Sequence, residues 1–105
     1  METLARKQKA MSVRVTCINK DNGDHYDPHE AITHLGWINE SNGKTGKSTR
    51  AEMVKFLEDG NKAYTKDRFG NLAYLIVISR AGNKYVKTVA DGKETDNLLY
   101  LAECA

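Results

Sequence analysis

The sequence predicts an α+β fold, a small antiparallel sheet of about five strands in the order β-β-α-β-β-β with one helix packed on one face. Three observations lead to this prediction. Short branched or apolar runs recur along the chain, one segment alone has helical apolar spacing, and the connections are too short for parallel crossovers. With 105 residues, 40% of them hydrophobic, the chain can bury a core without a metal or a disulfide.

Two strands are predicted before the helix. Residues 13–18 alternate with period two, and a turn at residues 22–23 ends the first strand. Residues 27–30 imitate a helix start, with an aspartate, a proline and a glutamate at capping positions. Residues 31–35 are short and rich in branched side chains, which favours a second strand instead.

One helix is predicted over about residues 50–59. Thr49 and Glu52 form a capping box, residues 53–57 supply an apolar stripe, and Gly60 provides a C-terminal cap. A polar loop is predicted over residues 41–46.

Three more strands follow the helix. They are expected at residues 63–65, 72–79 and 84–89, and residues 97–101 form an apolar tail that should dock on the core. The basic start, residues 1–11, is predicted to be a disordered arm. Residues 12–105 then make a single domain.

Charge and cysteine content bound the class of protein. The net charge of +2 is too small to indicate nucleic-acid binding by itself, although residues 21–43 carry only acidic charge and most charged residues among 44–93 are basic. No apolar run is long enough for a membrane helix, and no signal-peptide core follows the basic start. The expectation is a cytoplasmic protein in which Cys17 and Cys104 are free thiols.

Four ordered blocks of sequence resemble a known family. They are residues 16–20, 27–36, 84–92 and 96–104. Together they are similar to a family of small prokaryotic and phage proteins catalogued only as a domain of unknown function. The resemblance spans residues 13–104, supports a strand at residues 32–35, and implies no activity. Trp37 and Ala102 depart from the family pattern, where glycine and proline are expected.

A lysine-rich surface is the first candidate binding site. Residues 43–49 end like a phosphate-binding P-loop, but only two residues separate the first glycine from the Gly-Lys pair, where a P-loop has four. Lysines near the helix start and on the last strand would still hold an anion, and neighbouring tyrosines would stack on bases. The candidate nucleic-acid or anion-binding residues are Lys44, Lys47, Lys84, Lys87 and Lys93.

The acidic, histidine-bearing segment from residue 24 to residue 34 is the alternative site. Its histidines, His25, His29 and His34, stand among carboxylates, which are suitable ligands for a divalent ion. In a strand these histidines would not share one face, so their spacing is poor for a metal. The segment therefore gives the runner-up function, a small-ligand or metal-binding domain.

No assembled catalytic set is recognisable, which favours a non-enzymatic binding module without a cofactor. A macromolecular partner is expected, a protein in preference to a nucleic acid, and no membrane. Trp37, Ile38 and Tyr100 are the candidate partner-binding residues because they would form an apolar or aromatic patch. An open sheet also has unpaired edges, so an edge strand would allow a homodimer.

Overall fold

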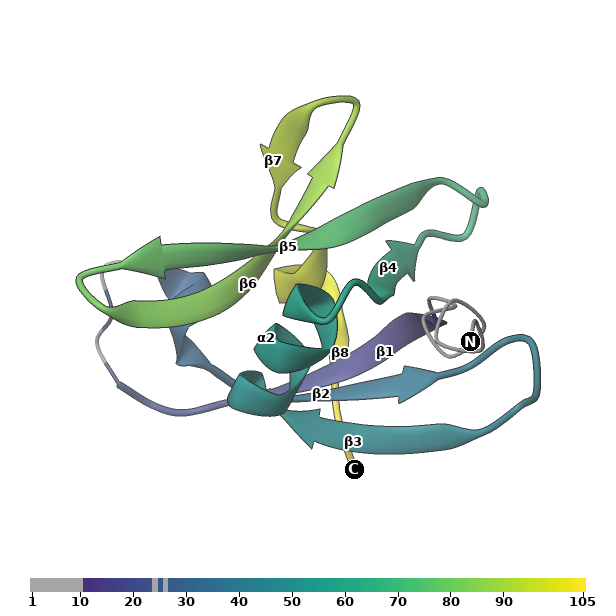
Figure 1. Cartoon of the computed structure of the whole chain (residues 1–105), viewed down its shortest axis with the longest axis horizontal. Coiled ribbons are helices and arrows are strands. Elements are labelled where there is room, and N and C mark those ends of the chain that lie inside the picture. Colours follow the sequence, from purple (N-terminus) through teal and green to yellow (C-terminus); the bar gives the residue numbers. More distant parts are fainter. Residues whose placement is uncertain (1–10, 24, 26) are drawn as a thin grey trace, which may run out of the picture.

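Strands are the main regular structure in the computed structural model, which describes residues 11–23, residue 25 and residues 27–105 (Figure 1). The strands are β1 Ser12–Lys20, β2 Ile32–Ile38, β3 Thr45–Thr49, β4 Lys62–Lys66, β5 Leu72–Arg80, β6 Asn83–Ala90, β7 Lys93–Thr95 and β8 Ala102–Glu103. The α-helix is α2, Arg50–Glu58, and two single turns of 3-10 helix are η1, Pro28–Ala31, and η2, Asn97–Tyr100.

The predicted five-stranded antiparallel sheet is wrong. The described residues form one eight-stranded sheet in the order β3-β2-β1-β4-β5-β6-β7, and β8 pairs separately with β1. The sheet is mixed, because β1 runs parallel to both β4 and β8. The strands missing from the prediction are β3, β7 and β8: β3 is polar throughout and the other two are very short, so none of them shows a hydrophobic period.

The helix α2 begins where its capping box predicts. The Thr49 hydroxyl accepts the backbone N–H of Glu52, and the Glu52 carboxylate accepts the backbone N–H of Thr49. The chain leaves the helix through Gly60, whose φ of 95° is left-handed and favours glycine. The helix lies between the β1–β3 part of the sheet and the β5–β6 part, and its Met53 is only 2% exposed (Figure 1).

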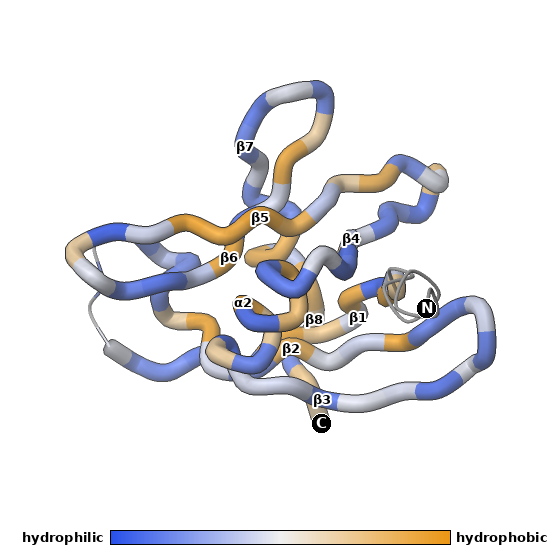
Figure 2. Tube along the Cα trace, viewed as in Figure 1, coloured by the Kyte–Doolittle hydropathy of each residue, from blue (hydrophilic) through white to orange (hydrophobic). Residues whose placement is uncertain are grey.

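The core occupies the space between these two parts of the sheet. Figure 2 shows that parts of β1, β2, β5 and β6 are apolar. The core residues come from seven elements and are Val13, Val15, Ile18, Ile32, Leu35, Met53, Val54, Ala63, Leu75, Val86 and Leu98. No helix in the described part of the chain has the length and apolar composition needed to cross a membrane.

Both patterns noted in residues 27–35, the helix start and the branched run, correspond to structure: a 3-10 turn comes first and a strand follows it. Asp27 and Glu30 form the capping box of η1, a single 3-10 turn that begins at Pro28. The strand β2 starts directly after this turn, at Ile32. The helix start is real, but the branched residues that follow it pair as a strand with β1.

A disulfide ties the C-terminal end of the chain to the middle of β1. Cys17 and Cys104 are bonded, with their Cα atoms 5.0 Å apart, so the prediction of free thiols is wrong. A Cβ on Gly36 would overlap the Cys17 sulfur and approach the Cys104 sulfur to 3.0 Å. The absence of a side chain at Gly36 therefore makes room for the disulfide.

Of the predicted N-terminal arm, residues 1–10 lie outside the described residues. Met11 is described, and both of its backbone groups are bonded. Its N–H donates to the Asn61 side chain at 2.9 Å, and its carbonyl accepts from the Lys62 N–H at 2.8 Å.

Candidate functional site

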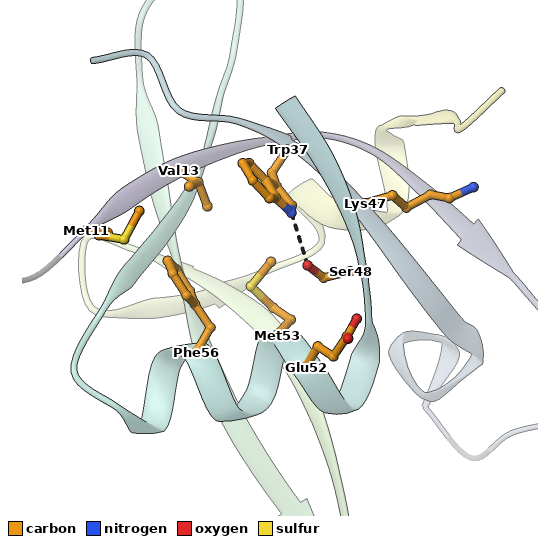
Figure 3. A pocket seen from close by; sticks show the side chains of 8 residues that line it. All are labelled: Met11, Val13, Trp37, Lys47, Ser48, Glu52, Met53 and Phe56. Atoms are coloured by element: carbon orange, nitrogen blue, oxygen red, sulfur yellow. Dashed lines mark hydrogen bonds between the residues drawn. The ribbon is translucent and has the colours of Figure 1, made fainter. Parts of the chain in front are cut away.

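An apolar groove of about 290 Å³ lies between α2 and the first three strands (Figure 3). Val13 on β1 and Trp37 on β2 form one side, and Met53 and Phe56 of α2 point toward them from the other. Lys47 and Ser48 border the groove on β3. A pocket of this size and lining suits one or two apolar side chains of a partner better than a large ligand.

The indole of Trp37 lies across β3 because Gly46 leaves room for it. Trp37 and Gly46 are directly opposite each other in the β2–β3 ladder. The indole N–H donates to the Ser48 hydroxyl at 3.0 Å, a bond that fixes the ring against β3 (Figure 3). The Trp37 ring, which starts from β2, therefore provides apolar surface next to the outermost strand of the sheet.

We expect Gly46→Ala to displace this indole and lower stability by about 1–3 kcal/mol. The new Cβ would lie 2.5 Å from Trp37 Cζ2 and 2.9 Å from Cε2, closer than the ring can tolerate. Trp37 is the chain's single tryptophan, so its fluorescence should shift to the red as the ring enters water. Trp37→Phe should suppress much of the Gly46→Ala penalty in a double-mutant cycle, and full additivity of the two changes would contradict this account.

Successive residues of β3 direct their backbone N–H and C=O groups alternately toward β2 and toward the outer edge of the sheet. Asn39 donates to the Lys44 carbonyl at 2.7 Å, which makes this pair the hydrogen-bonded pair that opens the ladder. By the alternation of an antiparallel ladder, Gly46 and Ser48 also bond to β2, whereas Thr45 and Lys47 direct their N–H and C=O groups outward. Among the described residues, no strand pairs with this outer edge.

The five predicted lysines do not form one surface. Lys44 and Lys47 lie at the β3 edge, whereas Lys84 and Lys87 on β6 and Lys93 on β7 lie toward the opposite end of the strand order. Lys84 pairs with Glu58 at 2.6 Å, and Lys87 pairs with Asp27 at 3.2 Å and Glu94 at 2.9 Å. Among the described residues, no carboxylate lies within ion-pair distance of Lys44 or Lys47, so these two remain as an unneutralised pair.

The three predicted partner-binding residues are also separated. Trp37 faces the groove, while Ile38, the next residue of the same strand, points to the other face of the sheet. Tyr100 lies on η2 and is 83% exposed, beside Thr65 and Leu101 rather than beside the groove. Of the three, Trp37 alone belongs to the groove.

The histidines of the acidic segment have separate environments. His25 pairs with Asp21 at 2.8 Å, and His34 contacts the Thr33 hydroxyl at 3.0 Å. His29 is 1% exposed and bonds through Nδ1 to Asp27 at 2.8 Å. The described residues contain no group of three or more His, Cys, Asp or Glu side chains arranged to hold a metal ion.

Asp27 is the electrostatic centre of this segment. Burial opposes its ionisation, but the backbone N–H and ring of His29 and the ammonium of Lys87 outweigh burial and lower the pKa of Asp27 to about 2. The Tyr85 hydroxyl lies 3.4 Å from the same carboxylate. These contacts join η1 to β6, so the segment has a structural role in this fold.

Sequence reasoning missed most of the groove. Met53 and Phe56 are expected from the sequence only as part of the apolar stripe of the helix, and the loop expected at residues 41–46 overlaps the first two residues of β3. A usable signal was present, because Gly46 and Ser48 are small residues at alternate positions immediately before a helix cap. Such a pattern fits a strand that passes under a large side chain.

Comparisons with known proteins give a family and no function. A family model described as a protein of unknown function (DUF3892) matches residues 14–102. This match confirms the resemblance to a family of unknown function. No curated protein and no solved structure matches the chain.

Proposed function

The chain belongs to the DUF3892 family of proteins of unknown function, and we propose that it is a non-enzymatic module that binds an extended segment of a partner protein along β3. One observation carries this proposal, the unpaired outer edge of β3 beside the apolar groove under α2. An edge strand next to a side-chain pocket supplies both elements of recognition by strand addition.

The backbone of β3 would provide the affinity. The outward N–H and C=O groups of Thr45 and Lys47 are spaced to pair with an incoming strand. Thr49 contributes less, because its N–H is already bonded to the Glu52 carboxylate at 2.8 Å. The partner strand would therefore pair mainly with Thr45 and Lys47.

The charge distribution favours a peptide over a nucleic acid. A strand of nucleic acid needs a continuous basic track along its phosphates. The β3 edge offers Lys44 and Lys47, and the remaining candidate lysines lie toward the far end of the sheet, two of them neutralised by carboxylates. The two basic groups at β3 suit a short acidic segment instead.

The proposal can be tested by selecting binders from a library of random linear peptides and titrating them against two variants at one position. Lys47→Pro removes the outward N–H and adds a ring where the partner strand would lie, without breaking a bond to β2. Lys47→Thr removes the same charge but keeps the N–H. We expect Lys47→Pro to abolish binding and Lys47→Thr to weaken it only severalfold.

Unfolding curves of both variants establish that the fold is retained. Equal affinity of wild type and a folded Lys47→Pro variant would overturn strand addition at β3. Binding of random single-stranded DNA at physiological ionic strength, lost in a double Lys44→Gln, Lys47→Gln variant, would replace the peptide by a nucleic acid. Failure of the library to give any binder would also count against the proposal.

A further inference from the structure

We infer that the partner segment has the pattern apolar–acidic–apolar, with the acidic residue directly opposite Lys47. This inference rests on the proposed function and names the chemistry of the partner at the same site. It follows from which face of β3 each side chain occupies. Successive residues of a strand alternate between the two faces, and directly opposed residues on neighbouring strands share a face.

Lys47 and Trp37 lie on opposite faces of the sheet. Gly46 is directly opposite Trp37 in the ladder and therefore shares its face, so the next residue, Lys47, belongs to the other face. Figure 3 shows the Lys47 side chain extending away from the groove that Trp37 lines. A partner residue opposite Lys47 would thus lie outside the groove, and its two neighbours would lie on the groove side.

Charge selects the central partner residue. Lys47 has no carboxylate within ion-pair distance among the described residues, and neither has Lys44 at the start of the hairpin strand. Opposite charges directly across a strand pair are favourable and like charges are unfavourable. An aspartate or glutamate opposite Lys47 satisfies this preference.

The apolar surface selects the flanking residues. On the groove side, β3 carries only Gly46 and Ser48, and the Trp37 ring lies above them. An apolar side chain from the added strand would pack against this ring, which lines the groove. Both neighbours of the acidic residue face this surface, which gives the apolar–acidic–apolar order.

A second copy of this chain is disfavoured as the occupant. The antiparallel register that overlaps all five residues of two β3 strands places Lys47 opposite the Lys47 of the other copy. Two ammonium groups in that position repel each other, as edge lysines do in strands that avoid self-pairing. The same lysine that opposes self-association favours an acidic partner.

The test compares synthetic peptides with a central Leu-Glu-Leu, Leu-Lys-Leu or Glu-Leu-Glu sequence in one neutral flanking sequence, by fluorescence polarisation. We expect the Leu-Glu-Leu peptide to bind most tightly, with Leu-Lys-Leu roughly fivefold weaker and Glu-Leu-Glu roughly tenfold weaker. The charge-reversal variant Lys47→Glu should invert the preference, so that Leu-Lys-Leu binds more tightly than Leu-Glu-Leu. Lys93→Glu, which reverses a lysine on β7, is the matched control and should leave the order unchanged.

The outcomes separate this inference from the proposed function. Library peptides that bind wild type, fail to bind Lys47→Pro and lack the alternating pattern would overturn the inference and leave strand addition at β3 intact. An unchanged peptide order in Lys47→Glu would also overturn it. Self-association of the chain that is lost in Lys47→Pro would show that the edge takes a second copy instead.

Discussion

Reducing the disulfide between Cys17 and Cys104 is expected to lower the free energy of unfolding by about 2–5 kcal/mol. The two cysteines are 87 residues apart in sequence, so their bond closes nearly the whole chain into one loop. Opening so long a loop gives the unfolded state much more conformational freedom. Urea unfolding of the oxidised protein, with and without a dithiol reductant, measures the change.

The folded state has little else to hold the C-terminal strand. β8 contains two residues, both exposed, and pairs with β1 at Cys17 and Ile18 only. The Cys104 N–H donates to the Ile18 carbonyl at 3.0 Å, and the Asn19 amide donates to the Cys104 carbonyl at 3.2 Å. We therefore expect reduction to release β8 before the rest of the sheet unfolds.

A double variant, Cys17→Ser with Cys104→Ser, is the control for the reductant. Its unfolding midpoint should equal that of the reduced wild type and should not respond to the dithiol. A wild-type midpoint that moves no more than that of the double variant would contradict the prediction. The rate of amide hydrogen exchange at the C-terminal end should rise in the reduced wild type and in the double variant, because β8 lacks the disulfide in both.

The local elements of this fold were predictable because each has a local cause. The capping box of Thr49 and Glu52 marks α2 within a residue or two of its observed ends. Alternation marks β1, and a wholly apolar run marks β5, a strand with neighbours on both sides. These signals need only a few adjacent residues to act.

The missing parts depend on residues that are far apart in the sequence. β3 is a strand because β2 pairs with it and Trp37 covers Gly46, and neither contact is visible in the sequence Thr-Gly-Lys-Ser-Thr. The disulfide joins residues near opposite ends of the chain. Ion pairs across the fold, such as that between Lys87 and Asp27, likewise removed two lysines from the predicted basic surface. Long-range pairing thus decides the site.

Replacing Asp27 by asparagine should cost about 2 kcal/mol at neutral pH and almost nothing near pH 2. The pKa of Asp27 is lowered from 3.8 to about 2 in the folded protein. Its ionised form therefore stabilises the fold fully above the unfolded value. This contribution is lost as the pH falls through the folded value. An asparagine keeps the shape of the side chain and an oxygen for the His29 N–H, but it has no charge for Lys87.

The gap in stability between wild type and Asp27→Asn is the quantity to measure, by urea unfolding at several pH values. Other carboxylates with lowered pKa values, Asp21 and Glu30 among them, also respond to acid. They are present in both proteins, so their effects cancel in the difference. The gap should close between about pH 4 and about pH 2, because over this range Asp27 takes up a proton in the unfolded state while it stays largely ionised in the folded state. A gap that is constant over this range would show that Asp27 acts through hydrogen-bond geometry and not through its charge.

The variant Lys87→Met is a second check, because it removes the half-buried cation that faces Asp27 from β6 and should reduce the pH dependence in part.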